Sequence, residues 1–124
     1  MILATIRLPW PPARTSANAS QQGNWRGKAG AARSYKHLCW AICKDQKVQK
    51  IRLNHAGDIP VTVTYCPPRN GRVDWDNLAG RCKQGFDAVA EAIGIDDGRW
   101  WPVTSARGEA VPGGAVIIEI GGAA

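Results

Sequence analysis

Apolar and polar residues alternate in several short segments, which is the pattern of strands with one buried face. Residues 2–8 place Ile2, Ala4, Ile6 and Leu8 on one side, and the prolines that follow Trp10 cannot donate to a strand ladder. Further strands are predicted at 59–65, 100–105 and 115–120. The sequence therefore predicts four strands.

Two segments between these strands repeat their apolar residues at steps of three and four, the period of a helix with one buried face. The first is expected at about 31–50, with these residues inward: Tyr35, Leu38, Cys39, Ile42 and Cys43. The second is expected to begin at Asn77, a favoured N-cap residue, and to stop at Gly94, which tolerates the left-handed conformation. Its inward residues are Leu78, Cys82, Phe86, Val89 and Ile93.

The predicted order is β-α-β-α-β-β, which indicates an α+β fold with a small mixed sheet and two helices, both on one side. At 124 residues the chain is expected to form one domain, 1–124, large enough to bury an ordinary core. Residues 13–30 are polar apart from Trp25 and are expected to form a long loop.

Two compositional features bear on the compartment. No apolar run approaches the ~20 residues that cross a bilayer, and the N-terminus does not resemble a signal peptide, so we expect a soluble, cytoplasmic protein without a membrane partner. The four cysteines lack paired Cys-x-x-Cys spacing. We expect them to serve as small buried apolar residues in a reducing compartment.

Charge is unevenly distributed along the chain. Residues 1–44 carry +7 with no acidic residue, residues 45–73 carry +3 and the remainder carries −4, within a net charge of +6. A basic first half beside an acidic segment suits a polyanion that is held by one part and cut at the other, although a solvated basic face fits the same pattern. The candidate phosphate-binding residues are Arg14, Arg26, Lys28, Arg69, Arg72 and Arg81.

The segment 72–97 contains six of the ten acidic residues. If Asp74 and Asp76 lie in extended backbone, their carboxylates share one face, because side chains alternate along a strand. On a continuous helix after them, Lys83 and Asp87 lie near Asp76 and away from the apolar face. Asp96 and Asp97 follow the helix. Such hard oxygen donors favour Mg²⁺ or Mn²⁺ over zinc.

The ordered motifs of this segment resemble those of the RusA family of Holliday junction resolvases. The similarity covers Leu8-Pro9-Trp10-Pro11-Pro12, the 67–72 turn, Asp74-Trp75-Asp76-Asn77-Leu78, Phe86-Asp87-Ala88 and Gly94-Ile95-Asp96-Asp97. These correspond to the family's opening strand, turn, D-x-D-N-L, D-A and Gly-to-Asp-Asp elements, in the same order. The match spans most of the chain, and the aspartate motifs are its specific part.

The resemblance implies a homodimeric, bacterial or prophage endonuclease that makes paired nicks in four-way DNA junctions during recombination and repair. It implies Mg²⁺, with Mn²⁺ as a substitute, held by Asp74, Asp76 and Asp97 or Asp96. Asp74, Asp76 and Asp97 would act in catalysis together with Lys83. The family lysine commonly stands four residues after the second aspartate, where this chain has Gly80, and Lys83 is the candidate replacement, with Arg81 as the next.

Other interpretations remain open for these residues. Asp74, Asp96 and Asp97 also suit caps and turns, and Asp87 suits either hydrogen bonding behind the metal ligands or a solvated helix face. An alternative function is a junction- or duplex-binding protein without cleavage activity. A metal nuclease indifferent to DNA structure and a protein-interaction module with an acidic, metal-stabilised loop are further alternatives, and the basic charge disfavours the last.

Overall fold

The computed structural model describes residues 1–13, 25–53 and 56–122, except for the side chains of 25–28. In chain order the elements are β1 (Ile2–Pro9), α2 (Trp25–Asp45), β2 (Ile59–Cys66), α3 (Trp75–Arg81), α4 (Lys83–Ile93), the short 3-10 helix η2 (Asp97–Arg99), β3 (Trp100–Arg107) and β4 (Ala115–Gly121). The predicted α+β class and the four strands are confirmed, with one predicted helix divided into α3 and α4.

The four strands form one mixed sheet in the order β1-β4-β2-β3. β4 pairs antiparallel with both β1 and β2, whereas β2 and β3 run parallel. The parallel pair requires a crossover, and the segment containing α3 and α4 supplies it. β1 and β3 are therefore the two edges of the sheet.

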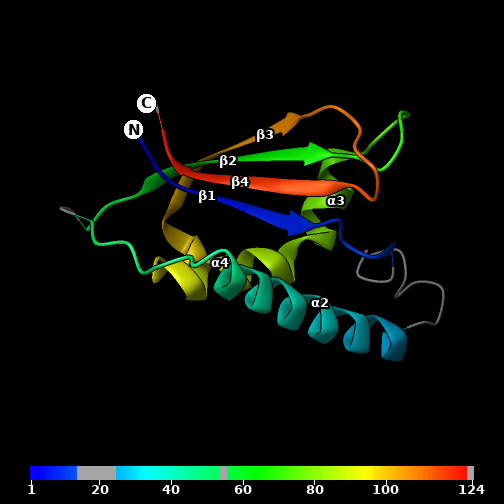
Figure 1. Ribbon diagram of the computed structural model, residues 1–124, viewed down its shortest axis with the longest axis horizontal. Coiled ribbons are helices and arrows are strands. Elements are labelled where there is room, and N and C mark those ends of the chain that lie inside the picture. Colours follow the sequence, from blue (N-terminus) through cyan, green and yellow to red (C-terminus); the bar gives the residue numbers. More distant parts are fainter. Residues whose placement is uncertain (14–24, 54–55, 123–124) are drawn as a thin grey trace.

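The helices α2 and α4 pack side by side on one face of the sheet, and the other face has no helix over it among the described elements (Figure 1). The one-sided arrangement explains the alternation in β2, where Ile59, Val61, Val63 and Tyr65 are buried and the residues between them are partly exposed. Gly85 of α4 permits close approach, because a Cβ there would lie 3.1 Å from both Leu8 Cδ1 and Tyr35 Cε2.

The core lies between this sheet face and the helices. Its members from the strands include Ile6, Leu8, Val61, Val63, Val116, Ile118 and Ile120, and its members from the helices include Tyr35, Cys39, Cys43, Cys82, Val89 and Ile93. The prediction that the cysteines are small buried residues holds for Cys39, Cys43 and Cys82, and all four are free thiols. Burial raises the pKa of Cys39 and of Cys82 to about 12, so these thiols stay protonated at neutral pH.

Two predictions about the first helix are corrected. The helix covers 25–45 instead of 31–50, since the segment before residue 31 is already helical and Lys47 adopts a left-handed φ of 57° just beyond the helix. Leu38 is 48% exposed instead of inward, because the described side chains of this helix that are fully buried are Tyr35, Cys39 and Cys43, at steps of four.

Strand β3 differs from the rest of the sheet in its exposure. After Trp100, which is buried, most of its residues are exposed, including Trp101 and Val103. Among the described strands β3 pairs with β2 alone, and α2 and α4 pack beneath the sheet without covering this edge (Figure 1). The helix-side face of β3 is consequently open.

Candidate active site

The acidic segment begins where the turn after β2 leads into α3. Asp74 is the N-cap residue, with extended backbone, and Asp76 already lies in the first turn of the helix. The predictions that both aspartates lie in extended backbone and that Asn77 is the N-cap are therefore wrong. Aspartate is as good an N-cap as asparagine, and an acid in the first turn is favoured by the helix dipole, so the helix starts earlier.

Asp74 and Asp76 are both exposed to solvent. The side chain of Asp74 makes no capping hydrogen bond, and Asp76 Oδ1 accepts a hydrogen bond of 2.9 Å from the backbone N–H of Asn77. Carboxylates that remain at the surface keep oxygen lone pairs available to a cation or to water.

The predicted continuous helix is divided at Cys82, which serves as the C-cap of α3 and the N-cap of α4. Lys83 thus opens a new helix, and its relation to Asp76 is not that of residues on one uninterrupted helix. Its position relative to Asp87 is as predicted, one turn apart on the same face, with Nζ 3.0 Å from Asp87 Oδ1.

Lys83 also joins the helix to the Asp96-Asp97 segment. Its Nζ lies 2.7 Å from Asp97 Oδ2, and hydrogen bonding to Asp97 and then to Asp87 raises the pKa of Lys83. Asp96 instead caps η2, accepting a hydrogen bond of 3.2 Å from the N–H of Gly98. The two neighbouring aspartates therefore have different partners, with Asp97 in an ion pair and Asp96 in a turn.

Within the described residues, which include all five of these aspartates, no three His, Cys, Asp or Glu side chains form a group that could hold a metal ion. Mg²⁺, however, commonly binds through one or two carboxylates and keeps several waters, completing its shell with substrate phosphate. The exposed pair Asp74 and Asp76 fits that mode in donor type and number.

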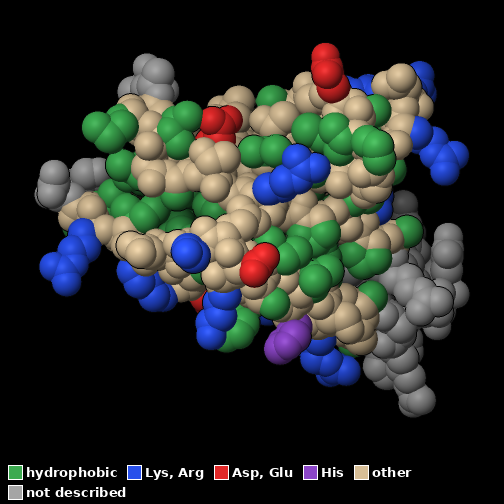
Figure 2. Space-filling view, viewed as in Figure 1, with side chains coloured by type: hydrophobic (Ala, Val, Ile, Leu, Met, Phe, Trp, Pro, Cys, Tyr) green, Lys and Arg blue, Asp and Glu red, His purple; other side chains and the backbone are tan. Residues whose placement is uncertain are grey.

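Asp74 also lies on the wall of a groove that we call the basic groove. It has a volume of about 470 Å³ and is lined by Trp10, Pro67, Pro68, Arg69, Asn70, Gly71, Arg72, Val73, Asp74, Asn77, Leu78 and Arg81. The fold thus brings three of the predicted phosphate-binding residues, Arg69, Arg72 and Arg81, to one place beside Asp74. In Figure 2, Lys and Arg side chains are also visible at the end of the molecule where the turn between β2 and α3 lies.

Arg81 has a structural role in addition to its place in the groove. It donates a hydrogen bond of 2.5 Å to the backbone oxygen of Pro11, and its guanidinium carbon lies 5.9 Å from the centre of the Trp10 ring. Partial burial lowers the pKa of Arg81. Arg81 therefore holds the segment after β1 against α3, while Arg69 and Arg72 are exposed.

The side chains of the remaining predicted DNA contacts are not among those the structure describes. Arg14 belongs to the segment 14–24, and Arg26 and Lys28 lie in the first turns of α2, where side chains are not described. Helical backbone at Arg26 and Lys28 does correct the prediction that the loop extends to residue 30.

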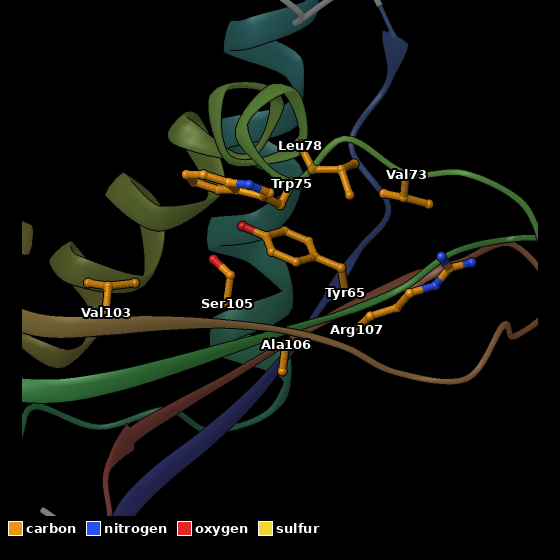
Figure 3. Close-up of a pocket in the computed structure, with 8 residues that line it drawn as sticks. All are labelled: Tyr65, Val73, Trp75, Leu78, Val103, Ser105, Ala106 and Arg107. Atoms are coloured by element: carbon orange, nitrogen blue, oxygen red, sulfur yellow. The ribbon is translucent and has the colours of Figure 1, made fainter.

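A second concave surface, which the sequence did not predict, lies on the other side of the α3 start. This apolar hollow has a volume of about 440 Å³ and is lined by Tyr65, Val73, Trp75, Leu78, Val103, Ser105, Ala106 and Arg107 (Figure 3). A sequence signal existed in Trp75, a large aromatic residue between two aspartates. The sequence does not show which strand lies opposite Trp75, because that depends on the order of the strands in the sheet.

No family model matches the chain. An uncharacterized protein of Xylella fastidiosa is 27% identical over 120 residues, which cover 97% of this chain and 77% of that protein. The resemblance to the RusA family therefore stays a prediction from the sequence motifs. No helix within the described part of the chain is long and apolar enough to cross a membrane.

Proposed function

We propose that the chain is a Mg²⁺-dependent endonuclease of the RusA type that cleaves four-way DNA junctions in recombination and repair. The observation that carries the proposal is the basic groove with Asp74 on its wall. A cluster of arginines attracts a phosphate backbone, and Asp74, on the groove wall, belongs to an exposed Asp-x-Asp pair that suits the metal ion of phosphodiester hydrolysis.

The groove residues act by charge and geometry. Arg69 and Arg72 bind backbone phosphates, and Arg81 keeps the groove wall in shape through its contacts with Trp10 and Pro11. Asp74 and Asp76 would hold Mg²⁺, with water and a phosphate oxygen completing its shell. When bound, Mg²⁺ would lower the pKa of a coordinated water and neutralise charge on the phosphate.

Lys83 supplies a cation beside Asp97. Its ammonium group forms ion pairs with both Asp97, at 2.7 Å, and Asp87, at 3.0 Å, in the free protein. During phosphodiester hydrolysis negative charge grows on the phosphate oxygens, and a cation already held in place stabilises that charge without reorganisation. We assign Lys83 the part of the family lysine, whose usual position is Gly80 here.

The expected assembly is a homodimer, because a four-way junction offers two equivalent strands and each subunit would cut one. Hydrolysis in line with the leaving group would leave ends that a ligase can rejoin. The net charge of +6 is consistent with such a polyanionic partner.

The test is cleavage of a labelled synthetic four-way junction in Mg²⁺, beside linear duplex of the same sequence. We expect paired, symmetric nicks in the junction and none in the duplex. Asp76→Asn, which keeps the shape but removes the charge, should abolish cleavage while junction binding persists. Glu119→Gln on the sheet is the matched control, because it removes one carboxylate outside the groove. Equal cutting of duplex and junction would point to a nuclease without structural preference.

A second function, junction binding without cleavage, is favoured by two observations. Gly80 stands where the family lysine is expected, and Lys83 is already in ion pairs with Asp87 and Asp97. A parent protein that binds the junction tightly in Mg²⁺ and Mn²⁺ but never nicks it would establish this alternative and exclude the nuclease.

A further inference from the structure

The apolar hollow is the feature that the proposed function does not use. Its walls come from three elements, with Tyr65 from β2, Val103 and Ser105 from β3, and Trp75 from α3. Trp75 is 65% exposed and Val103 is 46% exposed. Large apolar side chains that stay in water around a concave surface mark a binding site more often than isolated exposed residues do.

The arrangement of the side chains narrows the kind of ligand. In Figure 3 the side chains of Tyr65 and Ser105 extend from the sheet toward the indole of Trp75, and Arg107 lies to the side, nearer Val73. The hollow thus combines an accessible aromatic face, an apolar wall, two hydroxyls and one cation. A flat, polar-edged aromatic ring suits such a site, since one face can stack while its edge forms hydrogen bonds.

The hollow and the basic groove are neighbours. Val73 and Leu78 line both, and the Asp-x-Asp segment runs between them, with Asp74 on the groove and Trp75 on the hollow. Arg107 connects the two as well, because its guanidinium donates to the backbone oxygen of Gly71 in the turn that carries Arg69 and Arg72. A nucleotide strand with its phosphate at Asp74 therefore has the hollow beside it.

We propose that the apolar hollow receives one unpaired DNA base, stacked on Trp75, from a nucleotide adjacent to the phosphate at Asp74. This inference rests on the proposed function. A base at a branch point is less firmly paired and stacked than one inside a duplex, so moving it into the hollow costs less there than in linear DNA. The hollow would then contribute to the choice of junction over duplex and of the cutting position.

A second copy of the chain is the competing occupant, since exposed apolar residues on an edge strand can also form a dimer contact. Two features favour the base. Arg107 places positive charge at the hollow, and the neighbouring groove is basic, so the whole surface attracts a polyanion. The exposed hydroxyl of Ser105 also suits the edge of a base better than an apolar side chain.

The experiment uses synthetic four-way junctions carrying 2-aminopurine at one position near the branch point, moved one nucleotide at a time. With residues 1–124 in the absence of divalent ions, we expect a fluorescence change confined to one position, because the fluorescence of 2-aminopurine reports on stacking. Trp75→Ala should remove that change and weaken junction binding about tenfold, the effect of losing one stacked base. Trp75→Phe should retain most of the fluorescence change and most of the junction binding.

Trp101→Ala is the matched control, because Trp101 is 62% exposed on β3 but does not line the hollow. Ser105→Leu, which fills the hollow, should reproduce the loss seen with Trp75→Ala, and circular dichroism verifies that each variant is folded. Equal binding by Trp75→Ala and Trp101→Ala, with junction cleavage intact, would overturn the inference and leave the proposed function standing.

Two other outcomes separate the competing explanations. If Trp75→Ala converts a dimer into a monomer in sedimentation without removing a position-specific signal, the hollow is a protein contact and the inference fails. If the parent protein binds neither junction nor duplex, the proposed function fails, and the inference fails with it.

Discussion

At the scale of single residues, the main question is which cation serves the site. Gly80 follows Asp76 by four positions, in the same helix α3, and a Cβ built there meets no atom within 4 Å. A lysine can therefore be introduced at 80 without steric conflict. A lysine at position 80, where the family has its lysine, can thus be compared directly with Lys83 as the cation of the site.

We predict that Lys83→Ala lowers the rate of junction cleavage by about 100-fold or more, the usual effect of removing a preorganised charge from a transition state. Junction binding should change less than threefold. Adding Gly80→Lys to Lys83→Ala should recover part of the rate, and Gly80→Ala in the same background should recover none. Single-turnover cleavage under saturating protein measures these differences. Full activity of Lys83→Ala would remove Lys83 from the catalytic residues.

The same substitution has a small expected effect on folding. Lys83 is more than half exposed, so solvent screens its pairs with Asp87 and Asp97. Thermal unfolding of Lys83→Ala should resemble that of the parent closely, which makes the variant a clean probe of catalysis. A large loss of stability would show that the ion pairs hold η2 against α4.

At the scale of elements, the packing of α4 on α2 and the sheet depends on Gly85. A Cβ at that position would lie 3.1 Å from Leu8 Cδ1 and 3.3 Å from Cys39 Sγ. Gly85→Val should therefore destabilise the fold by about 2 kcal/mol through overpacking. Gly80→Ala is the matched control. It should raise the free energy of unfolding by about 0.5–1 kcal/mol, because in an open helical site it only reduces the backbone freedom of the unfolded chain. Urea denaturation followed by circular dichroism measures both.

Most of the helices and strands could be predicted from the sequence. Alternation located β1, β2 and β4, because in a sheet covered on one face burial and sequence period coincide, as in β2. β3 does not alternate, since most of its residues are exposed. Gly94 ended α4 as expected, with φ of 75°. The start of α3 was misplaced because Asp74 and Asn77 are equally good N-caps by residue type, and only the completed chain path selects one.

The site was less predictable than the fold. The aspartates and arginines were identifiable as residue types in order, but the interruption at Cys82 and the ion pair between Lys83 and Asp97 depend on tertiary packing. The apolar hollow requires the strand order β1-β4-β2-β3, which brings β3 opposite Trp75. Periodicity contains no information about such long-range neighbours.

At the scale of the whole molecule, the buried thiols link stability to pH. Burial raises the pKa of Cys39 and Cys82 from 9.0 to about 12. Because the thiols of the unfolded chain ionise at a lower pH than those of the folded protein, the two buried thiols favour the folded state fully below pH 9. This contribution to the free energy of unfolding is lost as pH rises toward 12. The melting temperature should fall over that window. Cys39→Ala and Cys82→Ala should each flatten the decline, and an unchanged slope would contradict this cause.

The distribution of charge over the molecule leads to a last prediction, on salt. If the basic groove binds phosphates, each arginine that contacts a phosphate causes the release of a counterion from the DNA. The logarithm of the DNA association constant then decreases with the logarithm of the salt concentration, and removing one contact makes that slope shallower by roughly 0.9. Arg69→Ala and Arg72→Ala should each reduce the slope by about this amount, measured by fluorescence anisotropy with a labelled junction. Arg52→Ala, exposed but outside the groove, should leave it unchanged. Equal reductions in all three variants would mean that DNA is attracted by overall charge alone and that the groove is not the path of the strand.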